Sequence, residues 1–178
     1  FAEMIGLGFP GGAQLDRLAK AGNNKAYEFP RSMVKEDNYL MSFSGLKASG
    51  QRMVEQLKKE LSPEEFHKRQ ADLCASYQEA AVDMLMAKLD RAFVKTGIRR
   101  VSITGGVSAN SRLRERAEQW AQQKGIDLQI PPLRFCTDNA AMIGLAGVMR
   151  FQQGQISSLD LGPSPNSYDS DFQGGKNR

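Results

Sequence analysis

Histidine and cysteine are scarce in this 178-residue sequence, which has one histidine and two cysteines. A single histidine, His67, cannot form a His-x-x-x-His metal pair or an HExxH protease motif within this chain. The sequence also shows no credible Ser-His-Asp set. Cys74 and Cys136 lie far apart, and neither belongs to a CxxC motif, which argues against a disulfide framework or a cysteine zinc site. This usage is typical of a reducing compartment, and we expect a cytoplasmic protein.

Long hydrophobic runs and blocks of one charge are also missing. The longest apolar stretches are far shorter than the roughly 20 residues of a membrane span, and the first residues do not resemble a signal peptide. The net charge of +4 comes from basic residues interleaved with carboxylates, which is compatible with nucleic-acid binding without requiring it. We therefore predict a soluble globular domain without a membrane partner.

The order of the predicted elements is typical of an α/β fold. Short β-branched stretches at 99–104 and 126–130 predict strands, and residues 39–43 alternate well enough for a third. Apolar periodicity predicts helices over residues 15–21, 44–57, 63–96, 112–124 and 139–153, and residues 1–5 resemble the end of another helix. This order predicts a mixed sheet with crossover helices. The polar, glycine-rich residues 164–178 are predicted to be a disordered tail.

Two glycine pairs suggest places where a ligand approaches the backbone. Gly105-Gly106 follows a predicted strand and precedes a helix start, where free N–H groups and a partial positive charge suit a nucleotide or another anion. Gly11-Gly12 precedes Asp16, whose carboxylate can accept hydrogen bonds from ribose hydroxyls. Both pairs can equally be ordinary tight turns, with Asp16 a solvated residue in the first turn of a helix.

A carboxylate stands near the start of the last predicted helix. Asp138 follows the break at Pro131-Pro132 and is surrounded by small residues. Its ordinary interpretation is a helix N-cap, which contributes about 1 kcal/mol.

Together these segments resemble the tRNA N6-adenosine threonylcarbamoyltransferases, formerly called O-sialoglycoprotein endopeptidases. The two main motifs are Gly105-Gly106-Val107-Ser108-Ala109-Asn110 and Cys136-Thr137-Asp138-Asn139-Ala140-Ala141-Met142. Further matching segments occur in family order at Phe9-Pro10-Gly11-Gly12, Phe29-Pro30-Arg31-Ser32-Met33, Ser42-Phe43-Ser44-Gly45-Leu46-Lys47 and Ser76-Tyr77-Gln78-Glu79-Ala80. The resemblance covers residues 1–163.

The resemblance implies a fold and a missing part. The strand and glycine turn before Ser108 are similar to the adenosine motif of the actin, Hsp70 and sugar-kinase superfamily. Residues 1–163 are then expected to form the second, C-terminal lobe of a two-lobed actin-like ATPase fold, whose upstream lobe is absent from this sequence.

The resemblance also implies an activity. The family transfers a threonylcarbamoyl group from threonylcarbamoyl-adenylate to N6 of the adenosine beside the anticodon (A37) in tRNAs that read ANN codons. One iron or zinc ion is expected per full-length subunit, held by two upstream histidines and by Asp138. Gly12, Asp16 and Asn110 match family positions that contact the adenylate, whereas no catalytic residue is identified. Because the histidines are absent, we expect this segment alone to be inactive.

The expected partners are tRNA, a paralogous subunit and a small ATPase. Arg31, Arg112 and Arg114 are candidates for contacts to tRNA phosphates, with no motif to support them. Two alternatives remain, namely the nucleotide lobe of a sugar or acetate kinase and a non-catalytic scaffold paralogue. The segment around Asp138 argues against the kinase, and a scaffold has no need of a metal-binding aspartate.

Overall fold

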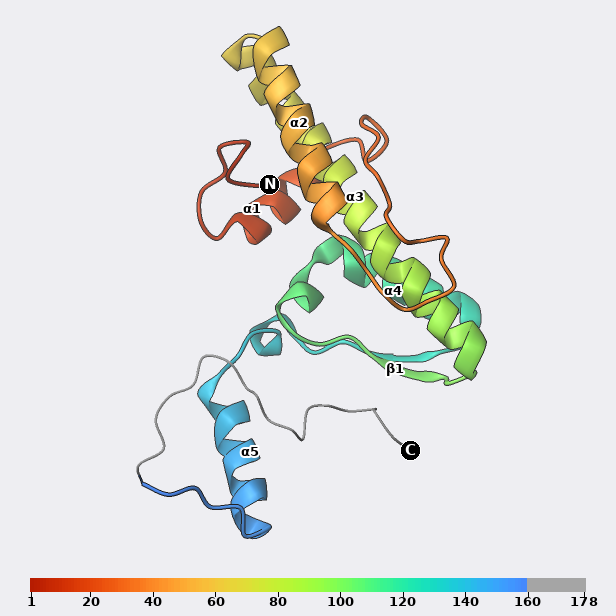
Figure 1. The fold of residues 1–178 in the computed structure, drawn as a ribbon, viewed down its shortest axis with the longest axis vertical. Helices are drawn as coiled ribbons and strands as arrows, with labels where there is room; N and C mark the ends of the chain where they lie inside the picture. The colour runs from red at the N-terminus through yellow and green to blue at the C-terminus, as the bar shows by residue number, and fades with distance from the viewer. Residues whose placement is uncertain (160–178) are drawn as a thin grey trace. The chain divides into compact units, whose positions relative to one another are not determined.

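The computed structural model describes residues 1–159 and divides the chain after Asp138 into two compact units. The first unit contains α1 (Gly11–Ala19), α2 (Ser44–Glu60), α3 (Pro63–Thr96), β1 (Arg100–Ser102), η1 (Gly106–Ala109), α4 (Ser111–Lys124), β2 (Asp127–Gln129) and η2 (Leu133–Phe135). The described part of the second unit contains α5 (Ala140–Gln152) (Figure 1). The predicted tail and the predicted end of the lobe at residue 163 lie outside the described residues.

The long helix α3 organises the first unit, and both of its ends form as predicted. Ser62 accepts a hydrogen bond from the Glu65 N–H, and the Glu65 carboxylate accepts one from the Ser62 N–H, which completes a capping box. Gly97 ends the helix in the left-handed conformation, with φ 66°. In Figure 1, α2 lies along α3. A core that includes Leu46 and Leu73 fills the space around these helices.

A second core joins the other half of α3 to α4 and the strands. It contains buried Val82, Met86, Leu113 and Trp120, with partly buried side chains from both strands packed against it. β1 and β2 pair in parallel, with Arg100 opposite Asp127, and α4 provides the crossover between them. The α/β pattern and its crossover helix are therefore confirmed, whereas the described residues contain a two-stranded parallel sheet rather than a mixed one.

The predicted strand at residues 39–43 is wrong, because this segment is irregular. It belongs to a stretch that runs along α3 in Figure 1, where Lys88 donates to the carbonyls of Glu36 and Asn38 at 3.1 and 2.8 Å. Arg91 donates to the Val34 carbonyl at 3.2 Å. Side chains of α3 therefore bind the backbone directly before this segment, and within it the Leu40 N–H donates to the Asn38 side chain at 3.0 Å.

Two predictions near the start of the chain are also corrected. Residues 2–6 form hydrogen-bonded turns rather than the end of a longer helix. α1 begins at Gly11, directly after the extended Pro10, so both glycines lie in its first turn instead of in a tight turn before it. The helix ends at Ala19, and Gly22 then lies so close to α3 that a Cβ there would be 2.0 Å from the Ala71 carbonyl oxygen.

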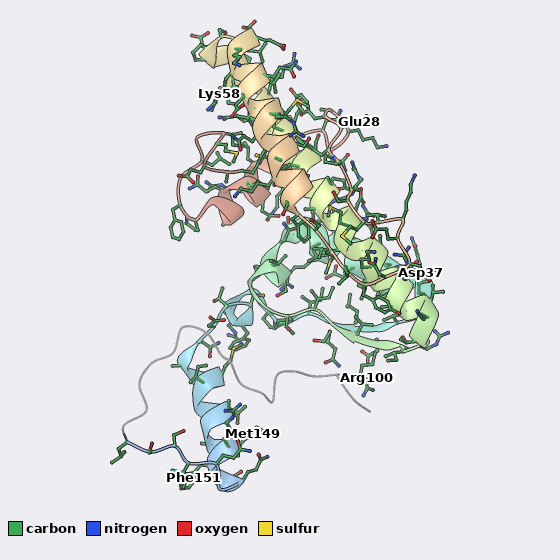
Figure 2. The ribbon with its side chains drawn as sticks, in the orientation of Figure 1. Glu28, Asp37, Lys58, Arg100, Met149 and Phe151 are labelled. Atoms are coloured by element: carbon green, nitrogen blue, oxygen red, sulfur yellow. The ribbon has the colours of Figure 1, made fainter. Side chains whose placement is uncertain are left out.

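The described second unit is an apolar helix. Ile143, Leu145, Met149 and Phe151 are each more than half exposed, and Figure 2 labels the last two on α5. Its start is capped by the Asn139 side chain, which accepts a hydrogen bond from the Met142 N–H at 3.1 Å. None of the described helices is long and apolar enough to cross a membrane.

Candidate functional site

Asp16 joins three helices at one carboxylate oxygen. Its Oδ1 atom accepts hydrogen bonds from the Ser111 N–H at 3.0 Å, from the Ser111 hydroxyl at 2.9 Å and from the Gln78 amide at 2.5 Å. Ser111 is the first residue of α4, where a negative charge is favoured by the helix dipole. α1, α3 and α4 therefore meet at Asp16, and its Oδ2 atom takes no part in these three bonds.

Asn110 lies at the same helix start. It is the N-cap of α4, and its Oδ1 atom accepts a hydrogen bond from the Leu113 N–H at 2.8 Å. The cap uses the oxygen, so the Nδ2 amide group remains able to donate to a ligand. Gly12 is exposed one helical turn before Asp16 on the same side of α1. The predicted residues Asp16 and Asn110 thus meet at the start of α4, and Gly12 lies one turn from Asp16 along α1.

The Gly105-Gly106 turn leads into this helix start through the short helix η1. Gly105 has φ 87°, which L side chains rarely adopt, and a Cβ at either glycine would meet nothing within 4 Å in the described structure. Ser108 is 1% exposed, and its hydroxyl has no hydrogen-bond partner among the described residues. An open backbone turn beside a buried, unpaired hydroxyl fits the approach of a polar ligand.

Asp138 is exposed and does not cap a helix. The neighbouring Asn139 caps α5, so the interpretation of Asp138 as an N-cap is wrong. An exposed carboxylate suits one oxygen ligand of iron or zinc. Within residues 1–159, no three His, Cys, Asp or Glu side chains form a group that could hold a metal ion.

A charged cluster that sequence reasoning missed lies between α3 and α4. Glu79 accepts two hydrogen bonds from Arg112, at 2.6 and 3.0 Å, and a third from Arg116, which also donates to Asp83 at 3.0 Å. The two acids, Glu79 and Asp83, are four residues apart on α3, and the two arginines are four residues apart on α4. This matching spacing of acids and arginines was the signal in the sequence.

The chemistry of this cluster shifts two pKa values. Burial by itself raises the pKa of Glu79, but the hydrogen bond and charge of Arg112, together with Asn24 and Arg116, hold it below its ordinary value. The hydrogen bond to Glu79 raises the pKa of Arg112.

An open cavity of about 410 Å³ borders this charged cluster and reaches Gln78 and Ser111 at the Asp16 junction. Both charged forms are therefore stabilised beside the candidate site.

The three arginines proposed for tRNA contact are engaged within the protein. Arg31 pairs with Asp83 at 3.0 Å, and Arg112 pairs with Glu79. Arg114 donates to the backbone carbonyls of Ser108 and Pro131. Their guanidinium groups already have acceptors, so the structure gives no support to a phosphate-binding role.

Comparison with known proteins identifies one family. The family model described as tRNA N6-adenosine threonylcarbamoyltransferase matches residues 1–145. A relative of that name from Bdellovibrio bacteriovorus is 62% identical over 173 residues, which cover 97% of this chain and 49% of the relative. Those from Cytophaga hutchinsonii and Thermotoga neapolitana are 45% and 44% identical, covering 92% and 93% of this chain and 47% and 48% of their own lengths. The chain spans about half the length of these curated relatives.

Proposed function

This chain belongs to the tRNA N6-adenosine threonylcarbamoyltransferase family, and from this membership we propose the activity of the whole protein. It transfers a threonylcarbamoyl group from threonylcarbamoyl-adenylate to N6 of A37 in tRNAs that read ANN codons. The observation that carries the proposal is the family match over both motif segments. The arrangement of Asp16 and Asn110 around one helix start supports it.

The adenylate would bind around the start of α4. The glycine turn leaves backbone open beside the ligand, and the positive end of α4 favours its phosphate. Asn110 would donate from its Nδ2 atom, and Asp16 would accept a ribose hydroxyl at its Oδ2 atom, while Gly12 permits close approach on the ribose side. Because Oδ1 of Asp16 is held by three donors, the carboxylate would be oriented before the ligand arrives.

Asp138 would contribute one carboxylate oxygen to an iron or zinc ion, with the remaining ligands supplied by the upstream half. When bound, this ion supplies Lewis-acid polarisation of the carbamoyl group and orients the adenylate. The donor type and the exposure of Asp138 fit this role.

Residues 1–163 would form the second lobe of an actin-like ATPase fold. A two-stranded parallel sheet is smaller than an independently stable one, and parallel sheets are normally covered on both faces. An apolar groove of about 350 Å³ near the end of β1, lined by residues that include Met41, Leu89 and Ile103, supports further packing here. The apolar α5 is likewise typical of a helix inside a larger protein.

The same reasoning gives the partners and the compartment. We propose that the whole protein acts on tRNA in the cytoplasm, together with a paralogous subunit and a small ATPase. No feature of the described residues favours the kinase alternative, and the family match argues against it.

A transfer assay tests the proposal. The full-length parent protein, its Asp138→Ala variant and an Asp37→Ala control are incubated with threonylcarbamoyl-adenylate, unmodified tRNA and the partner proteins. The tRNA is then digested, and the modified nucleoside is measured by mass spectrometry. Asp37 is a suitable control because its carboxylate is highly exposed and its ion pair with Arg91 is long, at 3.7 Å. Its loss should therefore disturb the fold little.

We expect product from the parent and the control and none from Asp138→Ala, with all three proteins folded. Equal product from Asp138→Ala would exclude Asp138 as an essential metal ligand. A folded parent that forms no product would refute the transferase assignment and favour a scaffold.

A further inference from the structure

Arg114 connects two segments that are distant in the sequence. Its Nε atom donates to the Ser108 carbonyl at 2.6 Å, and its Nη2 atom donates to the Pro131 carbonyl at 2.6 Å. The same Nη2 atom lies 3.1 Å from the Cys136 sulfur. One guanidinium group in α4 therefore contacts both the turn after Gly105 and the segment that follows β2.

Two of the residues that Arg114 contacts are buried, and the third is half-buried. Ser108 is 1% exposed and Cys136 is 2% exposed, while Pro131 is of intermediate exposure. Contacts of a charged donor with shielded acceptors are stronger and more directional than those at an open surface. Arg114 is therefore placed to fix the distance between these segments.

Arg114 provides a side-chain tie from the glycine turn to the segment from Pro131 to Cys136. The described backbone hydrogen bonds of this segment are local, from the Phe135 N–H to the Pro132 carbonyl and from the Cys136 N–H to the Leu133 carbonyl. The Cys136 sulfur also lies 3.7 Å from the Pro131 carbonyl oxygen. These contacts shape the segment internally, whereas Arg114 links it to the glycine turn.

We propose that Arg114 is a positioning residue that places Asp138 relative to the adenylate-binding turn. The inference rests on the proposed function, in which the turn binds adenylate and Asp138 binds the metal ion. Asp138 lies two residues after Cys136, so the placement of Cys136 limits where the carboxylate can reach. Arg114 thus acts through Asp138 and not on tRNA phosphates.

Lysine cannot replace arginine in this role. The planar guanidinium group presents several N–H donors in a fixed fork and can hold two separated acceptors in one geometry. A lysine ammonium keeps the positive charge but concentrates its donors on one atom. Arg114→Lys therefore separates the effect of geometry from that of charge.

The test uses the full-length parent protein and its Arg114→Lys variant. Arg116→Lys is the matched control, because Arg116 lies on the same helix but bonds to Glu79 and Asp83. Affinity for iron and for zinc is measured by competition with a chelator and elemental analysis. Thermal unfolding shows that each variant is folded, and kcat and KM for threonylcarbamoyl-adenylate are measured separately.

We expect Arg114→Lys to bind the metal roughly 10- to 100-fold more weakly than the parent, as is usual when a residue that orients a ligand is lost. Arg116→Lys should retain the parent's affinity. In an Asp138→Asn background, Arg114→Lys should cause no further loss of metal affinity, because the ligand through which it acts is already gone. kcat should fall more than KM rises.

Unchanged metal affinity in a folded Arg114→Lys variant would overturn the inference. If that variant does not fold, Arg114→Gln is measured instead, because a single amide group cannot hold the Ser108 and Pro131 carbonyls together, and unchanged affinity in folded Arg114→Gln has the same meaning. A parent that binds neither iron nor zinc overturns the inference together with the proposed metal site. A parent that binds metal but transfers no threonylcarbamoyl group contradicts the proposed function alone, because the metal measurements still decide the role of Arg114.

Discussion

Replacing Glu79 by glutamine should destabilise the protein through two arginines at once. The Glu79 side chain is 11% exposed, while those of Arg112 and Arg116 are 27% and 30% exposed. Glutamine has a similar shape but no negative charge and only one acceptor oxygen. The variant therefore leaves two partly buried guanidinium groups without their shared carboxylate.

The size of the effect follows from this burial. Removing one partner of a buried ion pair lowers the free energy of unfolding by about 3–5 kcal/mol. Because the two arginines are partly exposed, we expect Glu79→Gln to lower it by about 3 kcal/mol. For a protein of about twice this chain's length, as the relatives are, 1 kcal/mol shifts the unfolding midpoint by about 1–2 °C. We therefore expect Tm of the full-length parent to fall by about 3–6 °C.

Calorimetry of the full-length parent tests this value against Glu115→Gln. Glu115 also bonds to Arg112, at 2.7 Å, but its side chain is 53% exposed, so its loss should cost less than about 1 kcal/mol. If Glu79→Gln lowers Tm no more than Glu115→Gln does, the reasoning from burial is refuted.

The stability of Glu79→Gln should also depend less on pH than that of the parent. The pKa of Glu79 is held below its ordinary value of 4.5 in the folded protein. The ionised carboxylate therefore contributes fully to stability above pH 4.5, and this contribution is lost as pH falls through the lowered pKa of the folded protein. Between about pH 6 and about pH 3, the parent should lose more stability than Glu79→Gln. Equal losses would show that Glu79 is not stabilised as a carboxylate.

Three further predictions concern backbone packing and helix starts. Gly22→Ala should prevent α1 and α3 from packing as observed, because the new Cβ would lie 2.0 Å from the Ala71 carbonyl oxygen, and a Tm close to the parent's would contradict this. Ser62→Ala should cost about 1 kcal/mol by removing the capping box with Glu65, measured by urea denaturation, and no change in the midpoint would count against it. Asn110→Ala should remove a similar capping energy and also weaken adenosine monophosphate binding, measured by calorimetry, whereas unaltered binding would leave Asn110 as a cap only.

Local signals in the sequence predicted both ends of α3 correctly. The capping residues Ser62 and Glu65 and the terminal Gly97 act within a few positions of one another, so the chain contains the whole signal. The strand predicted at 39–43 failed for the opposite reason. Alternation shows that a segment can pair, but the partner strand must come from a distant part of the chain. Here Lys88 of α3, 50 positions from Asn38, binds the backbone directly before the segment instead.

The candidate site was predicted in part. The resemblance selected Gly12, Asp16, Asn110 and Asp138. The structure brings Asp16 and Asn110 to one helix start, while the binding roles of all four stay predictions. The shared contact at Ser111 was not predictable, because no local pattern relates a hydroxyl of α4 to a carboxylate of α1. Asp138 left two interpretations open until the capping contact of Asn139 removed one.

The junction at Asp16 determines when the site can form during folding. Its bonds to Ser111 join residues 95 positions apart, and its bond to Gln78 spans 62. Forming contacts across such long loops costs conformational entropy, and these contacts typically form late in folding. A partly folded chain in which α1 has not docked lacks the oriented carboxylate altogether. A ligand held by Asp16 therefore binds the native state selectively and stabilises it against every incompletely folded form.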